Sequence, residues 1–208
     1  MRKSPANAYI DAFNLYYGAL QHTPYKWLDL RALLERLFPQ NDIRRIRYFT
    51  ARVGARPGDP QQPQRQATYL RALETLPGIS LHFGTFLQHR VHMRLVHPPA
   101  KGPRSVEVFK TEEKGSDVAL ASHLLLDGFN KDYEAAIVLS NDSDLAEPVR
   151  MVREELGLRI GIANPHKRPS KELKADFFRQ IRQSHLKASQ LRPILTDKNG
   201  TFHKPPSW

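Results

Sequence analysis

Two aspartates stand two residues apart at a point where an apolar run ends. Residues 135–139 read as a buried strand, and Asp142 and Asp144 follow them just before a helical pattern that begins near Leu145. Two like charges at this spacing repel each other unless something positive lies between them. Helix capping is the alternative, because an aspartate at the start of a helix accepts hydrogen bonds from free backbone amides. The pair therefore raises the question whether other carboxylates lie nearby.

Two further aspartates occupy equivalent positions. Asp11 directly follows the short apolar run 8–10, and Asp117 stands at the start of a later helical pattern. In parallel sheets, ligands bind beyond the carboxyl ends of the strands, so these acids are expected to meet the first pair at one sheet edge. Asp117 also has a purely structural explanation, because a negative charge in the first turn interacts favourably with the helix dipole. Asp11 has no comparable local reason to exist.

A bound divalent cation would account for four acids gathered in one place. Clustered carboxylates without compensation are destabilising or become partly protonated. Ligation by oxygen alone favours Mg²⁺ or Mn²⁺ over zinc, and no histidine pair at metal-ligand spacing accompanies the acids. Histidines 89, 92 and 97 are instead interpreted as hairpin surface or RNA contacts. The metal ligands expected from the sequence are Asp11, Asp117, Asp142 and Asp144.

The charge of the chain is strongly and unevenly basic. Its 208 residues carry a formal net charge of +11. Residues 164–208 contain 10 Lys and Arg against 3 Asp and Glu, whereas residues 1–163 contain 22 against 18. A basic face attracts polyanions, and we expect nucleic acid as the partner ahead of a merely solvated basic surface.

Composition excludes several other classes of protein. Hydrophobic residues make up 40% of the chain and charged residues 25%, as in ordinary globular proteins. Cysteine is absent, which excludes disulfides, a thiol nucleophile and a Cys-based metal site. No apolar run is long enough to span a membrane, so we expect no membrane partner and a cytoplasmic location.

Strand-like and helical patterns alternate along the chain. Strands are predicted at residues 8–10, 43–50, 79–83, 135–139 and 158–163. Helices are predicted at residues 28–38, 67–76, 116–126, 145–156 and 173–186, the last of them basic and amphipathic. A proline-rich loop covers residues 54–66, and residues 89–109 alternate as a β-hairpin with a proline-rich tip.

This alternation predicts an α/β fold in three layers with a central, mainly parallel sheet and a β-hairpin insertion. One domain is expected over residues 1–190. Residues 191–208 are basic and contain prolines, so we expect them to form a loose C-terminal tail, with its loose part from about Pro193.

Three separated motifs carry a family resemblance. "YIDAFNLYYG" (9–18), "EEKGSDVALASHLL" (112–125) and "VLSNDSDLAEPV" (138–149) resemble, in this order, the motifs of the NYN domain, a branch of the PIN-like nuclease superfamily. The resemblance spans about residues 8–182. Ala12 and Asn141 depart from it, because relatives often carry glycine at these small-residue positions, but neither departure removes an acid.

The resemblance implies a Rossmann-like PIN fold and metal-dependent cleavage of RNA, most simply as an endoribonuclease. It assigns the four aspartates to the catalytic metal site and Asn14 to the role of their polar partner. Ser140 and Lys114 match neighbouring motif positions. Glu112 or Glu113 would add an outer carboxylate, with a solvated charge pair as the alternative.

Hydrolysis would then use metal-activated water, and RNA would bind a basic surface. The residues expected to contact substrate are Asn14, Lys114, Ser140, Arg52 and Arg56. Further candidates are Arg65, Arg90, Arg94, Lys167, Arg168, Lys171 and Lys174. Tyr16, Tyr17 and Phe86 are candidates for stacking on bases, with core packing as the alternative.

Other functions remain open at this stage. The main alternative is a non-catalytic RNA-binding or scaffolding module with the same fold. A phosphatase of the haloacid-dehalogenase type needs an acid two residues after its nucleophile, where this chain has Phe13 after Asp11. A Toprim-type site leaves Asp11 and Asn14 unexplained. A homodimer and a protein regulator are both compatible with the sequence, which identifies neither.

Overall fold

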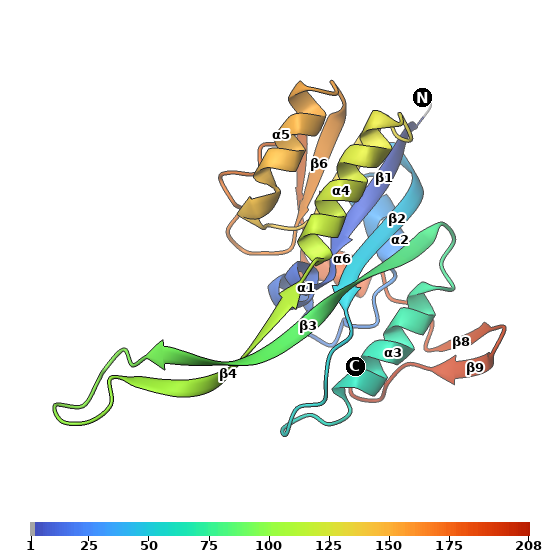
Figure 1. Ribbon diagram of the computed structural model, residues 1–208. Helices are drawn as coiled ribbons and strands as arrows, with labels where there is room; N and C mark the ends of the chain where they lie inside the picture. Colours follow the sequence, from blue (N-terminus) through green and yellow to red (C-terminus); the bar gives the residue numbers. More distant parts are fainter. Residues whose placement is uncertain (1–2) are drawn as a thin grey trace.

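A seven-stranded sheet forms the centre of the protein, as the computed structural model of residues 3–208 shows (Figure 1). The strand order is β4-β3-β2-β1-β5-β6-β7, and every neighbouring pair is parallel except β3 and β4. The predicted α/β fold with a mainly parallel sheet is thereby confirmed. The strands are β1 Ser4–Asp11, β2 Asn41–Ala51, β3 Ile79–Arg94, β4 Ser105–Lys114, β5 Ala135–Leu139, β6 Arg159–Asn164 and β7 Phe177–Gln180.

Helices cover both faces of this sheet, so each face has its own apolar core. Helices α4 (Ser116–Phe129) and α5 (Ala146–Glu154) pack on one face, against β1, β2 and β6. The other face is covered by α2 (Leu30–Leu37), which contacts both β2 and α6 (Gln183–Lys187). The remaining helical segments are α1 Ala12–Leu15, the π-helix η1 Tyr16–Leu20, α3 Gln62–Leu73 and the 3-10 turn η2 Ser143–Leu145.

Strand β1 lies in the middle of the sheet because its residues are apolar on both sides. Ala6, Ala8 and Ile10 belong to the core under α2, whereas Tyr9 belongs to the core under α4 and α5. Side chains alternate along a strand, so Asp11 projects on the same side of the sheet as Tyr9, toward α4. The end of the central strand therefore delivers a carboxylate to the α4 side.

A buried charge network holds α4 against the sheet. Asp127, near the end of α4, accepts hydrogen bonds of 2.7 Å from Tyr9 Oη and of 2.7 and 2.8 Å from the Arg47 guanidinium. Burial raises the pKa of Asp127, but the hydrogen bonds from Arg47 and Tyr9 outweigh it and hold the pKa below its usual value. One carboxylate thus joins α4 to both β1 and β2.

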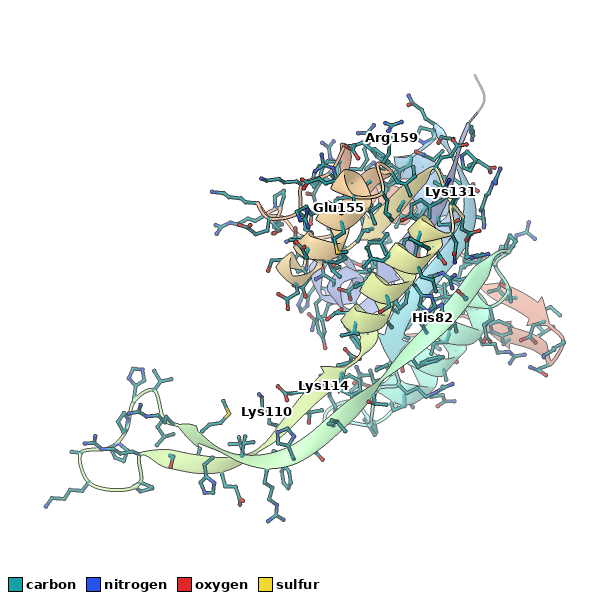
Figure 2. The ribbon with its side chains drawn as sticks, turned by 45° about the horizontal axis from the view of Figure 1, so that its top comes forward. His82, Lys110, Lys114, Lys131, Glu155 and Arg159 are labelled. Atoms are coloured by element: carbon teal, nitrogen blue, oxygen red, sulfur yellow. The ribbon has the colours of Figure 1, made fainter. Side chains whose placement is uncertain are left out.

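Strands β3 and β4 continue far beyond the body of the molecule as a two-stranded arm (Figure 1). The pairing runs from Thr85 opposite Lys114 to Arg94 opposite Ser105, which confirms the predicted hairpin and extends it toward the body. Figure 2 shows Lys110 and Lys114 along this arm. Gly84 stands at its base, where a Cβ atom would lie 2.6 Å from the Lys114 carbonyl oxygen. Only glycine permits this close approach of the two strands.

The predicted helix at residues 173–186 is wrong. This stretch forms a loop, strand β7 and the short helix α6. Its apolar residues Leu173, Ile181 and Leu186 are all buried, but Leu173 belongs to the core on one face of the sheet and the other two to the core on the opposite face, so they do not share one helical face. Phe177 packs directly over Gly161 of β6, and this cross-strand contact favours a seventh strand over helix.

The segment expected as a loose tail is ordered against α3. Strands β8 (Ile194–Asp197) and β9 (Gly200–His203) form a hairpin, and Arg71 of α3 makes two hydrogen bonds of 2.7 and 2.6 Å to the Asp197 carboxylate. Phe202 is buried, and the Trp208 ring packs edge-on against Tyr69 with centroids 5.7 Å apart. Sequence periodicity missed this hairpin because each strand has only four residues.

Replacing Asp127 by asparagine is expected to destabilise the protein by about 3 kcal/mol, because it leaves the Arg47 charge uncompensated in the core. Urea unfolding followed by circular dichroism measures this loss. Glu147→Gln is the matched control, since its ion pair with Arg150 is at the surface, where such pairs contribute little to stability. Equal stability of Asp127→Asn and the wild type would contradict the anchoring role of the network.

Candidate active site

An open cleft of about 440 Å³ lies at the carboxyl ends of β1 and β5, beside the start of α4. Three of the four predicted aspartates line it, namely Asp11, Asp117 and Asp142. Asp144 is exposed and lines a neighbouring hollow instead. Asn14, Arg56, Tyr17, Phe86 and Glu113 also line the cleft. Residues from distant parts of the chain therefore converge where the parallel topology predicts.

Asp11 is the most enclosed acid of the cleft, with 6% of its surface exposed. Its carboxylate accepts hydrogen bonds of 2.9 Å from the backbone amide of Asn14 and 3.0 Å from Ser140 Oγ. Burial raises the pKa of Asp11 to about 6, and the nearby charges of Asp117 and Asp142 add to this effect against the two hydrogen bonds. Asp11 is thus a buried acid, and no basic side chain of residues 3–208 lies at ion-pair distance from it.

Asp142, the first of the two acids after β5, both caps a helical turn and faces the cleft. The backbone amide of Asp142 donates to Ser140 Oγ at 3.1 Å, and the amide of Asp144 donates to Asp142 Oδ1 at 3.0 Å. Asp142 is therefore the N-cap of η2, as the capping interpretation expected. The same side chain also lines the cleft, so the two interpretations are compatible.

Asp117 meets a fifth acid that sequence reasoning undervalued. Burial raises the pKa of Asp117, and the charges of Asp142, Glu113 and Asp144 raise it further. Glu113 accepts hydrogen bonds from Ser116, at 3.2 Å from the amide and 2.6 Å from Oγ, and so holds the first turn of α4. The spacing of three residues between Glu113 and Ser116 was the only local signal for this role.

Asn141 joins the site to a basic loop. Its backbone amide donates to Asn14 Oδ1 at 2.9 Å, while its side chain accepts from the Ser170 amide at 2.7 Å and donates to the Arg168 carbonyl at 3.1 Å. The loop holds the exposed residues Lys167, Arg168 and Lys171. The sequence offered Asn141 only as a departure from the family motif, because the loop partner is almost 30 residues away.

Of the other residues predicted to contact substrate, some line the cleft and others lie outside it. Arg56 lines the cleft, whereas the Arg52 guanidinium lies 4.8 Å from the centroid of the Phe83 ring. Lys114 is exposed and its amine stands 3.4 Å from the Glu112 carboxylate, outside the residues that line the cleft. Among the aromatic candidates, Tyr17 and Phe86 line the cleft and Tyr16 faces a neighbouring cavity.

The donor set of the cleft fits a hard divalent cation. Within residues 3–208, no lysine, arginine or histidine lies at ion-pair distance from Asp11, Asp117, Asp142 or Asp144. Burial and the neighbouring carboxylates raise the pKa values of Asp11 and Asp117. Oxygen donors of this kind suit Mg²⁺ or Mn²⁺. As the side chains stand, however, no three acidic, histidine or cysteine residues of the described chain are grouped closely enough to hold a metal ion.

Comparison with known proteins gives one family and one curated relative. The sequence model of the NYN domain matches residues 6–182. A Pseudomonas putida protein named 6-hydroxy-3-succinoylpyridine 3-monooxygenase HspA is 33% identical over an alignment of 233 positions, which covers 96% of this chain and 74% of the relative. This named activity belongs to the Pseudomonas protein.

A solved structure shares the fold. The crystal structure of a Vibrio parahaemolyticus protein of unknown function superposes with a TM-score of 0.55, covering 91% of this chain and 98% of the other. At 16% identity the likeness concerns the fold alone. In residues 3–208, no helix is long and apolar enough to cross a membrane.

Replacing Asp11 by asparagine is expected to stabilise the metal-free protein at pH 7, by up to about 3 kcal/mol. The raised pKa means that the folded state binds this proton more tightly than the unfolded state does. Ionised Asp11 therefore costs stability above pH 6, and the wild type gains stability relative to the variant as the pH falls from 7 toward 4. Thermal unfolding in EDTA across this range measures the difference.

Added Mg²⁺ or Mn²⁺ provides the second arm of the same measurement. At pH 7 the cation is expected to raise the melting temperature of the wild type and to leave that of Asp11→Asn nearly unchanged. Asp42→Asn is a matched control, because Asp42 lies near the start of β2, at the opposite end of that strand from the cleft. A cation effect of equal size in all three proteins would place metal binding elsewhere.

Proposed function

Because the chain belongs to the NYN domain family, we propose that it is a metal-dependent ribonuclease that hydrolyses RNA phosphodiester bonds. One observation carries the proposal. Asp11, Asp117 and Asp142 gather in one cleft, and no basic side chain of residues 3–208 lies at ion-pair distance from any of them, although Arg56 lines the same cleft. A substrate phosphate is itself negative, so a cation bound between these acids would remove its repulsion from them.

Asp11, Asp117 and Asp142 would hold Mg²⁺ or Mn²⁺, with Asp144 at the margin. Such a cation, when bound, activates water as a nucleophile and stabilises charge that develops on the phosphate. Ser140 and Asn14 keep the acids in position, since Ser140 donates to Asp11 and Asn14 accepts from the backbone of Asn141. Glu113 holds the start of α4 and so the position of Asp117.

RNA would reach the cleft over two basic surfaces. One is the loop that Asn141 anchors, with Lys167, Arg168 and Lys171. The other is one face of the arm. Side chains two or four residues apart on a strand share a face, so one side of β3 carries Phe86, Arg90 and Arg94. Phe86 also lines the cleft. Phosphate contacts of this kind predict binding that weakens steeply with salt.

Cleavage of a labelled RNA with Mn²⁺ or Mg²⁺ is expected to fall at least about 100-fold in Asp142→Asn, because a ligand of the proposed cation is lost. The variant keeps the η2 cap, since asparagine also accepts the Asp144 amide. Circular dichroism checks the fold, and Asp42→Asn is expected to cut normally. Undiminished cleavage by Asp142→Asn would refute the proposed site.

A second candidate function is oxidation of a small aromatic compound. It is favoured by the 33% identity to the Pseudomonas monooxygenase across 96% of this chain. A monooxygenase inserts one atom of O₂ into its substrate and reduces the other to water with two electrons from a reductant. Substrate-dependent consumption of NADH with 6-hydroxy-3-succinoylpyridine, and a hydroxylated product, would favour this candidate over RNA cleavage.

A further inference from the structure

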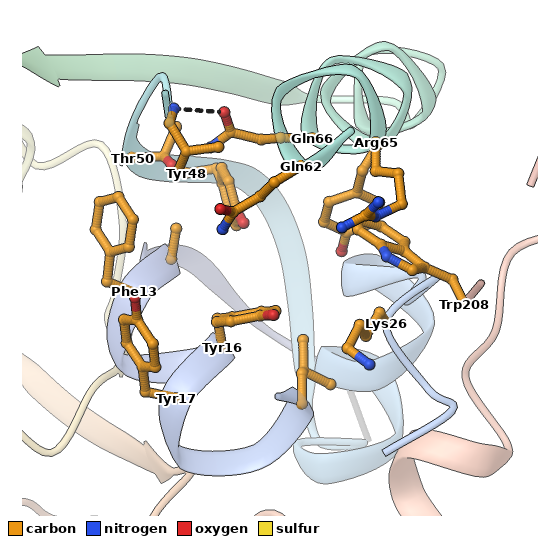
Figure 3. Close-up of a pocket in the computed structure, with 14 residues that line it drawn as sticks. Phe13, Tyr16, Tyr17, Lys26, Tyr48, Thr50, Gln62, Arg65, Gln66 and Trp208 are labelled. Atoms are coloured by element: carbon orange, nitrogen blue, oxygen red, sulfur yellow. Dashed lines mark hydrogen bonds between the residues drawn. The ribbon is translucent and has the colours of Figure 1, made fainter. Parts of the chain in front are cut away.

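A second cavity lies beside the cleft and shares the walls Phe13, Tyr17 and Val53 with it (Figure 3). Its volume is about 80 Å³. The lining comes from η1, α3, β2 and the C-terminus, which brings together residues that are far apart in the chain. The acids of the cleft do not line this cavity. It is therefore a separate feature with its own chemistry.

The cavity contains a lysine without an acidic partner. Lys26 Nζ donates to the Thr23 carbonyl at 2.9 Å, and no carboxylate of residues 3–208 lies within ion-pair distance of it. Burial lowers the pKa of Lys26, and the neighbouring charge of Arg65 lowers it further. Arg65 has one ion-pair partner, Asp59. Two cations and a single acid leave a positive charge that an anion would neutralise.

The cavity also contains a hydrogen-bond acceptor without a donor. Gln62 Oε1 is buried and has no hydrogen-bond partner among residues 3–208. Figure 3 shows the Gln62 side chain directed into the space above Tyr16. Buried polar atoms are almost always paired in native proteins, so an unpaired one needs an explanation. A ligand with an N–H or O–H group would satisfy it.

Aromatic walls define the shape of the ligand. Tyr16, Tyr48, Tyr69 and Trp208 line the cavity with flat rings, which favour a flat apolar surface on the ligand. An apolar cavity of about 150 Å³ is large enough to hold benzene. The present cavity, at about 80 Å³, is smaller and would enclose only the edge of an aromatic ring, which favours a single ring over a bulkier fused bicyclic ring.

We propose that this cavity binds a single-ring heteroaromatic anion. The edge of the ring enters between the aromatic walls and donates an N–H to Gln62 Oε1, while the anionic substituent meets Lys26 and Arg65. Two sources share this chemistry, namely a pyrimidine nucleotide, free or within RNA, and a free heteroaromatic carboxylic acid. Because binding requires no cleavage, the proposal does not depend on ribonuclease activity.

Calorimetric titration of the full chain in EDTA tests the proposal with the cleft free of metal. The probes are UMP, AMP, 6-hydroxynicotinate, benzoate and inorganic phosphate. UMP, 6-hydroxynicotinate or both are expected to bind at least tenfold tighter than AMP, benzoate or phosphate. Binding of UMP alone identifies the nucleotide source, and binding of 6-hydroxynicotinate alone identifies the free acid. Absence of binding by both, or equal binding of benzoate or phosphate, overturns the proposal.

Two variants locate the binding. Lys26→Met and Gln62→Met are each expected to weaken the bound probe at least tenfold, whereas Lys187→Met, at an exposed lysine on α6, leaves affinity unchanged. Gln62→Met removes an unpaired buried acceptor, so its melting temperature is expected to stay level or rise, which separates lost binding from unfolding. Unaltered affinity in both cavity variants would overturn the assignment.

Discussion

The hydrogen bonds of Asp127 to Arg47 and Tyr9 are the interaction on which the candidate site depends. They fix α4 across β1 and β2. Helix α4 carries Asp117 in its first turn, and β1 carries Asp11 two residues after Tyr9, on the same side of the strand. The anchor in the core and the acids at the sheet edge therefore share two rigid elements. Movement of α4 over the sheet would change the spacing of Asp117 and Asp11 directly.

The pKa values of two acids of α4 are shifted in opposite directions, because one acid has a cation beside it and the other faces carboxylates. Asp127 has a cation beside it, and its pKa is lowered although it is buried. Asp117 has none within ion-pair distance among the described residues and faces other carboxylates, so its pKa is raised. The core network is thus complete within the protein, whereas the cleft is electrostatically incomplete. This asymmetry is the reason why we propose a cation beside Asp117 and not beside Asp127.

Two long-range contacts connect the site to its surroundings. Asn141 joins the end of β5 to the basic loop, and Gly84 lets β4 approach closely enough for Glu113 to reach Ser116. The small cavity arises in the same way, because Trp208 of the C-terminal segment closes it against Tyr69. Each of these features needs segments that meet only in the folded chain.

The sequence alone determined the order of the main strands and helices as far as β6, the arm, and three of the four aspartates expected at one sheet edge. Periodicity, turn residues and the rule for parallel strands are local or topological signals, so a single chain reveals them. Only the tertiary structure decided that residues 173–186 form a strand and a short helix, that the tail is ordered, and that Glu113, Asn141 and Lys26 face particular partners. These outcomes depend on packing between residues far apart in the chain, and local patterns do not encode such contacts.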